Sequence, residues 1–115
     1  MKLGSEENFA AVLKHLAETI DNRADAGDSE ASYTAKLLKK GPNKTAKKMG
    51  EEAVELAIAL TSQSDDEVIA ETADVIYHLL VALRSRGISL DQIAEELAKR
   101  EGISGLVEKA SRPKE

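Results

Sequence analysis

Two pairs of acidic residues near the middle of the chain have the residue types and spacing of ligands for a divalent cation. Glu52 and Glu55 form the first pair, and Glu71 and Asp74 form the second, each with a spacing of three residues. Acidic pairs with this spacing occur as often in the chain as chance predicts for 21 acidic residues among 115. The spacing carries little information by itself, so the surroundings of each pair must decide its role.

On a helical wheel, both pairs lie among apolar residues. At about 100° per residue, Glu71, Asp74 and His78 share one stripe that apolar residues border on either side. Glu52 and Glu55 are bordered in a similar way. A helix that is apolar nearly all round is typically buried, so we expect these four carboxylates to face the inside of a helical bundle.

The residue types favour a hard cation as the partner of these carboxylates. Buried carboxylates stay ionised only when cations neutralise them. The chain has no cysteine, and oxygen ligands with a single nearby histidine favour Mg²⁺ or Mn²⁺ over zinc. Ions held in this way commonly serve phosphate chemistry, because they bridge phosphate oxygens and activate water. The alternative is that lysines and arginines pair with these carboxylates across the bundle.

The elements that carry these pairs are predicted to be helices. Apolar residues recur every three or four positions, glycines follow several of the predicted helix ends, and no alternating strand pattern competes. The pattern predicts a single all-α domain over residues 1–115, a compact bundle with the two acidic helices at its centre. The five predicted helices cover residues 5–23, 32–40, 43–62, 66–86 and 89–100.

Composition excludes several classes of protein. The chain has 16 basic and 21 acidic residues, a net charge of −5, and only three aromatic residues of the Phe, Tyr and Trp types. Such a chain repels a phosphate backbone and offers few rings for base stacking, so we expect no nucleic-acid partner. No signal peptide or membrane-spanning segment is predicted. We therefore expect a cytoplasmic protein without a membrane partner.

Three segments around the acidic pairs resemble the phosphoribosyl-ATP pyrophosphatase family, within the superfamily of all-α nucleoside-triphosphate pyrophosphohydrolases. These segments are residues 32–38, 47–55 and 71–80. Residues 87–90 and 104–112 also resemble the family, and the similarity extends from about Phe9 to Arg112. The two acidic pairs match the metal-binding signature of that superfamily. Met49, where an aliphatic residue is usual, and Thr72, where a smaller residue is common, are mild departures.

The resemblance implies an activity and an assembly. It implies Mg²⁺-dependent hydrolysis of phosphoribosyl-ATP at the α–β phosphoanhydride, which yields phosphoribosyl-AMP and pyrophosphate in the second step of histidine biosynthesis. It also implies a homodimer whose interface completes the helical bundle. Some relatives are fused to the cyclohydrolase of the next step, whose zinc site needs cysteines. Because this chain has none, we expect the stand-alone form.

Under this hypothesis the carboxylates have two roles, metal binding and orientation of the attacking water. Glu52, Glu55, Glu71 and Asp74 ligate Mg²⁺, which neutralises the triphosphate and the leaving pyrophosphate. One carboxylate also orients the attacking water, with Glu51 or Glu52 as candidates. The alternative for Glu51 is a surface acid near the start of its helix.

Basic, aromatic and histidine side chains are the remaining candidates. Lys48 shares the stripe of the acids and would contact phosphate oxygens, with Lys44 and Lys47 beside it, although lysines in such a run are often only solvated. By resemblance, Tyr33 and Thr34 line the nucleotide pocket. His78 could support a ligand carboxylate, or it could be a hydrogen-bonded core histidine.

Two other functions stay open at this point. One is a housecleaning pyrophosphatase that acts on aberrant nucleoside triphosphates. The other is a helical dimerisation module that has kept the fold and lost the chemistry, against which the intact set of four acids argues.

Overall fold

The computed structural model describes residues 4–26 and 32–101, and within these ranges the chain is an all-α bundle of five helices with no strands. A short 3-10 turn, Glu6–Asn8, precedes the helices. The helices are α1 (Phe9–Ala26), α2 (Tyr33–Lys39), α3 (Pro42–Ser62), α4 (Asp65–Ser85) and α5 (Leu90–Arg100). The predicted all-α class is confirmed, and the family-like segment at residues 104–112 lies outside the described residues. None of the described helices is both long enough and apolar enough to cross a lipid bilayer.

Local signals in the sequence explain where the helices begin and end. The Ser64 hydroxyl accepts a hydrogen bond from the backbone N–H of Glu67 and so caps α4. Ser89 and Gln92 cap α5 reciprocally through their side chains and backbone amides. Gly41, at φ 87°, allows the sharp turn from α2 into α3, where a side chain would be strained.

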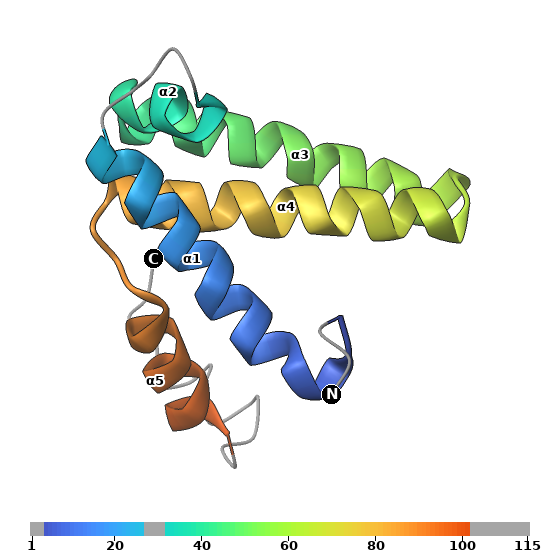
Figure 1. Cartoon of the computed structure of the whole chain (residues 1–115). Helices are drawn as coiled ribbons and strands as arrows, with labels where there is room; N and C mark the ends of the chain where they lie inside the picture. The colour runs from blue at the N-terminus through green and yellow to red at the C-terminus, as the bar shows by residue number, and fades with distance from the viewer. Residues whose placement is uncertain (1–3, 27–31, 102–115) are drawn as a thin grey trace, which may run out of the picture.

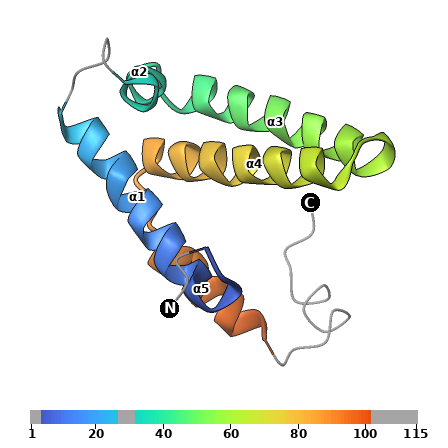
Figure 2. The ribbon, with the colours of Figure 1, turned by 45° about the vertical axis from the view of Figure 1, so that its right-hand side comes forward.

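The architecture is a long antiparallel hairpin with two helices packed at one end. Helices α3 and α4 run side by side along their length and are joined at Gln63 and Ser64 (Figure 1). Helix α2 lies where α3 begins and α4 ends, and α1 crosses α4 there (Figures 1 and 2). At this end of the hairpin the Thr45 hydroxyl and the Ser85 hydroxyl are hydrogen bonded at 2.9 Å.

The buried core lies at the same end of the hairpin. Ile20 of α1, Leu37 of α2, and Leu80 and Val81 of α4 form it, with partly buried residues such as Leu16 packed around them. Removing apolar area of this kind from water is the main stabilising contribution to folding. The core therefore fixes α1 and α2 against the C-terminal half of α4.

No other described helix covers the rest of the hairpin. Large apolar side chains are exposed along it, and Ile69 is the most exposed of them at 67%. The others on α3 and α4 are Val54, Ile58, Leu60 and Leu79. The sequence pattern predicts that α4 is buried nearly all round, but only His78, Leu80 and Val81 are buried. The reason is that none of the described residues forms a third layer over the half of the hairpin nearer the turn.

Candidate metal centre between α3 and α4

Three of the predicted carboxylates meet across the hairpin. Carboxylate oxygens of Glu52 and Glu55, on α3, and of Glu71, on α4, all lie within 4.8 Å of one another. Glu52 is buried, with 7% of its surface exposed, Glu71 is partly buried and Glu55 is exposed. The i, i+3 spacing puts the two α3 residues on one side of that helix, and the antiparallel packing brings α4 opposite.

The charges of this cluster are not balanced within the described chain. A hydrogen bond with Glu52, together with repulsion from the negative charges of Glu52 and Glu71, raises the pKa of Glu55. One carboxylate oxygen of Glu71, Oε2, is buried and has no hydrogen-bond partner among the described residues. A buried oxygen without a partner is costly unless something else satisfies it. These observations fit a bound cation with oxygen ligands.

The spacing of the oxygens suits a small cation. Mg²⁺ takes octahedral oxygen ligands at roughly 2.0–2.1 Å, so ligands across the ion lie about 4.2 Å apart. Adjacent ligands of such an ion lie about 2.9 Å apart, so the three carboxylates, whose oxygens lie within 4.8 Å of one another, would have to move closer together to bind one ion. Mg²⁺ in proteins usually keeps several water ligands and binds substrate phosphates. Coordination positions that the protein does not fill are therefore available for water and substrate.

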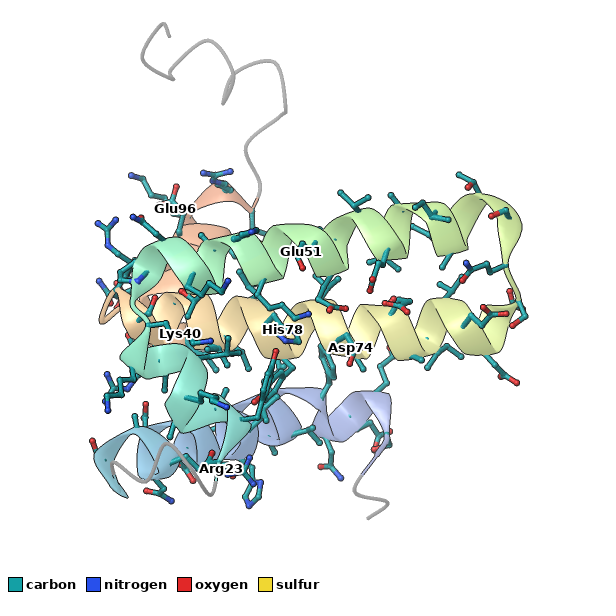
Figure 3. The ribbon with its side chains drawn as sticks, turned by 90° about the horizontal axis from the view of Figure 1, so that it is seen from above. Arg23, Lys40, Glu51, Asp74, His78 and Glu96 are labelled. Atoms are coloured by element: carbon teal, nitrogen blue, oxygen red, sulfur yellow. The ribbon has the colours of Figure 1, made fainter. Side chains whose placement is uncertain are left out.

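Asp74, the fourth predicted ligand, lies outside this cluster. It is on α4, one turn beyond Glu71, and its side chain is exposed. Figure 3 shows Asp74 and His78 in succession along α4, with His78 nearer the end where α2 packs. The expectation that all four acids face inward is met by Glu52 and partly by Glu71, whereas Glu55 and Asp74 are exposed. The uncovered half of the hairpin explains this difference.

Among the described residues, Lys48 places a positive charge beside the cluster. Its ammonium nitrogen lies 3.3 Å from Glu52 Oε1 and 3.9 Å from Glu51 Oε2. The hydrogen bond to Glu52 raises the pKa of Lys48, so the lysine holds its proton and its charge. Lys44 and Lys47 are exposed, and they form no ion pair with any residue in the ranges that the structure describes.

A group of rings lies beside Lys48 on the α2 side. The hydroxyl of Tyr33, the first residue of α2, lies 3.1 Å from Nε2 of His78. The Tyr33 and Tyr77 rings are stacked at 6.4 Å, and both meet the His78 ring edge-on. Thr34 is fully buried, and its hydroxyl is hydrogen bonded to the hydroxyl of Tyr77. The structure thus gathers two of the three aromatic residues of the chain near the carboxylates.

Of the two alternatives for His78, the structure fits the hydrogen-bonded core histidine, and one further member of the ring group was not predicted. Nδ1 of His78 bonds the backbone carbonyl oxygen of Asp74 at 2.8 Å, and neither ring nitrogen bonds a carboxylate among the described residues. Tyr77 was not a predicted site residue, although it directly precedes His78 in the sequence. Its place beside Tyr33 arises from contact between helices more than 40 residues apart, which periodicity within one helix does not show.

The cluster opens onto a hollow toward the turn of the hairpin. This hollow, of about 290 Å³, is lined by Glu55, Ile58, Gln63, Glu67 and Glu71. A second hollow, of about 390 Å³, lies between α1 and the end of α4, around the ion pair of Arg84 with Asp21. None of the clustered carboxylates lines that second hollow, so the smaller one belongs to the candidate metal centre.

Comparisons with known proteins agree on one family. The family model described as "Phosphoribosyl-ATP pyrophosphohydrolase" matches residues 13–101. "Phosphoribosyl-ATP pyrophosphatase 1" of Bradyrhizobium diazoefficiens is 57% identical over 100 residues, 87% of this chain and 93% of that protein. "Phosphoribosyl-ATP pyrophosphatase" of Caulobacter vibrioides is 54% identical over 106 residues, 92% and 97% of the two chains. "Phosphoribosyl-ATP pyrophosphatase 1" of Rhodopseudomonas palustris is 52% identical over 103 residues, 90% and 95%.

Proposed function

Because the chain belongs to the phosphoribosyl-ATP pyrophosphohydrolase family, we propose that it hydrolyses phosphoribosyl-ATP to phosphoribosyl-AMP and pyrophosphate, in histidine biosynthesis. The observation that carries the mechanism is the meeting of Glu52, Glu55 and Glu71, with a buried Glu71 oxygen that lacks a partner. A cytoplasmic location is part of the same proposal.

The carboxylates of the hairpin would hold Mg²⁺, with Mn²⁺ as a substitute. Glu52, Glu55 and Glu71 supply the first oxygens, and Asp74 joins them by rotation of its side chain, since side chains three apart on a helix have Cβ atoms about 5–6 Å apart. The bound ion would neutralise the triphosphate and lower the pKa of a coordinated water. No serine or cysteine nucleophile is required for this reaction class, because water attacks directly.

The chain's other groups act on phosphate and water. Lys48, already at the edge of the cluster, contacts phosphate oxygens as a point charge, and the exposed Lys44 and Lys47 extend the positive charge along α3. Glu51, exposed and 3.9 Å from Lys48, orients the attacking water, with Glu52 as the alternative. Tyr33, half of which is exposed, lines the nucleotide end of the site, and the buried Thr34 supports it through its hydrogen bond with Tyr77.

A second copy of the chain completes the proposed enzyme. The apolar side chains of the hairpin are too exposed for a stable monomer surface, and exposed patches of this kind mark protein interfaces. Ile58, half of which is exposed, lines the same hollow as Glu55 and Glu71. A partner that covered Ile58 would therefore also enclose the carboxylates and strengthen their hold on a cation.

The decisive assay combines substrate, metal and variants. Purified protein should convert phosphoribosyl-ATP to phosphoribosyl-AMP and pyrophosphate with Mg²⁺ and not with EDTA. Glu52→Gln and Glu71→Gln should each lower turnover by roughly 10²-fold. Glu95→Gln, an exposed acid on α5 far along the chain, is the control and should keep full turnover.

Three outcomes would contradict the proposal. Faster pyrophosphate release from ordinary or modified deoxynucleoside triphosphates than from phosphoribosyl-ATP would indicate a housecleaning enzyme. Unchanged Mg²⁺-dependent turnover in both glutamine variants would place the metal elsewhere. Absence of any turnover, with dimer formation retained, would indicate a dimerisation module.

A further inference from the structure

His78 lies on the face of α4 that carries the candidate metal centre. It follows Glu71 by seven residues, which is about 10.5 Å along the helix axis, and the two residues point within about 20° of the same direction. His78 is buried, and Figure 3 shows that it lies toward the end of α4 where α2 packs. Its ring is therefore about two turns from the carboxylates, a distance that a nucleoside with its α-phosphate can span.

Two hydrogen bonds orient the ring of His78. A backbone carbonyl oxygen only accepts, so Nδ1 of His78 donates its proton to the carbonyl of Asp74 at 2.8 Å. In the neutral ring Nε2 is then the acceptor, and the Tyr33 hydroxyl donates to it at 3.1 Å. The rings of Tyr33 and Tyr77 meet the His78 ring edge-on, with centroids 5.9 and 5.0 Å away, and restrict its rotation.

This order of hydrogen bonds determines what the Tyr33 oxygen offers to a ligand. A phenol has one proton, and the proton of Tyr33 is engaged by His78, so the oxygen presents only lone pairs. Half of the Tyr33 side chain is exposed, and among the described residues its hydroxyl has no hydrogen-bond partner other than His78. Such an oxygen attracts a hydroxyl donor and repels the negatively charged oxygens of phosphate.

We propose that Tyr33 accepts a hydrogen bond from a ribose hydroxyl in the nucleoside part of the substrate, and that His78 is the positioning residue that makes Tyr33 an acceptor. This inference rests on the proposed function. The phosphates bind at the carboxylates, and the nucleoside extends along α4 toward α2. His78 acts through Tyr33 and contacts neither the metal nor the substrate. The polarity of Tyr33 therefore helps to fix which end of the substrate lies at which end of the site.

Removing the Tyr33 hydroxyl should weaken substrate binding and leave the chemical step unchanged. Loss of one neutral hydrogen bond weakens binding by roughly three- to tenfold, so Tyr33→Phe should raise KM by that factor. Because the bond is made equally in the ground state and the transition state, kcat should stay within about twofold of the wild type.

Two substitutions of His78 separate its two hydrogen bonds. In His78→Gln the amide oxygen can reach the position of Nε2 and accept from Tyr33, whereas the shorter side chain of His78→Asn reaches only the position of Nδ1. His78→Gln should therefore keep KM near the wild-type value, and His78→Asn should raise it as Tyr33→Phe does. In the Tyr33→Phe background, His78→Asn should cause no further increase.

The experiment combines kinetics with binding of each product. It measures kcat and KM for phosphoribosyl-ATP with Mg²⁺, inhibition by pyrophosphate, and the Kd of phosphoribosyl-AMP in EDTA by isothermal titration calorimetry. In Tyr33→Phe the affinity for phosphoribosyl-AMP should fall by roughly three- to tenfold, and inhibition by pyrophosphate should not change. The ¹⁵N chemical shifts of the His78 ring should show the Nδ1–H tautomer in the wild type.

Ser85→Ala is the matched control for loss of stability. It removes a hydroxyl that bonds Thr45 between α3 and α4 at the same end of the hairpin, and it leaves Tyr33 and His78 in place. Ser85→Ala should keep the wild-type KM, the wild-type affinity for phosphoribosyl-AMP and the wild-type inhibition by pyrophosphate.

The outcomes separate this inference from the proposed function. A wild type that bound phosphoribosyl-AMP without hydrolysing phosphoribosyl-ATP would refute the proposed function, and weaker binding by Tyr33→Phe would still support the inference. Unchanged phosphoribosyl-AMP affinity in Tyr33→Phe, altered inhibition by pyrophosphate, or an Nε2–H tautomer of His78 would overturn the inference. Equal losses in His78→Gln and His78→Asn would also overturn it, because His78 would then have only a packing role. A wild type that bound no phosphoribosyl-AMP would overturn both.

Discussion

Gly50 sits in α3 between Lys48 and Glu52, and its replacement by alanine tests how the site is approached. A Cβ atom built at this position meets no atom within 4 Å among the described residues. Glycine within a helix costs about 0.5–1 kcal/mol relative to alanine, because it loses more backbone entropy on folding. With no clash to offset that gain, Gly50→Ala should raise the free energy of unfolding of the single chain by this amount.

The gain can be converted to a melting temperature. An unfolding entropy of about 2.1 cal/mol/K per residue, over a chain of 115 residues, makes 0.5–1 kcal/mol equivalent to an increase of about 2–4 °C. Differential scanning calorimetry in EDTA, at several protein concentrations, measures it. Ala57→Gly, at an exposed position of the same helix, is the control and should lower the melting temperature by a similar amount.

The activity of Gly50→Ala then completes the test. A stabilised variant with lower kcat/KM would show that substrate approaches the backbone at Gly50. A stabilised variant that dimerises less would show that a second copy of the chain approaches the backbone at Gly50. A lower melting temperature at every protein concentration would refute the reasoning, because it would mean that the space beside Gly50 is already filled within one chain.

Three further predictions concern charge, metal and assembly. In the metal-free protein the pKa of Glu55 is raised, so above its ordinary value of 4.5 the folded chain keeps a proton that the unfolded chain has released. The free energy of unfolding should therefore fall as pH rises through the raised pKa. A ¹³C titration of the Glu55 carboxyl, and the loss of this pH dependence in Glu55→Gln, check the prediction. Addition of Mg²⁺ should raise the melting temperature of the wild type but not of Glu52→Gln, and equal shifts in both would place the ion elsewhere. Ile69→Glu should turn a dimer into a folded monomer in light scattering, since Ile69 is exposed and its change alters monomer stability by only about 0.5 kcal/mol; a wild-type monomer would refute the proposed interface.

Most of the fold could be predicted because its signals are local. The caps at Ser64 and Ser89 and the glycine at position 87 give helix ends within one or two residues of those observed. The first helix is the exception: it begins at Phe9 because the preceding residues form a 3-10 turn, which apolar spacing alone does not distinguish from an α-helix.

The arrangement of site residues could be predicted only for residues whose relative positions are set within one helix or by a simple hairpin. The pairing of Glu52 with Glu55 follows from spacing, and their meeting with Glu71 follows from an antiparallel hairpin. The exposure of Asp74 could not be predicted, because the wheel shows which residues are neighbours and not whether another layer covers them. The contact of Tyr33 with His78 depends on how α2 packs against α4, which neither helix encodes separately.

Placing the carboxylates on both arms of the hairpin makes the length of its turn part of the site. Only Gln63 and Ser64 separate α3 from α4. Surface turns usually tolerate insertions and deletions. Here, one residue more or fewer between the helices, if α4 takes up the change, would rotate Glu71 by about 100° relative to the carboxylates of α3 and shift it by about 1.5 Å along the axis. The length of the turn therefore sets how the carboxylates of α3 and α4 align. A relative with the same four acids but a turn of another length would keep its helices, but its ligands would no longer be aligned.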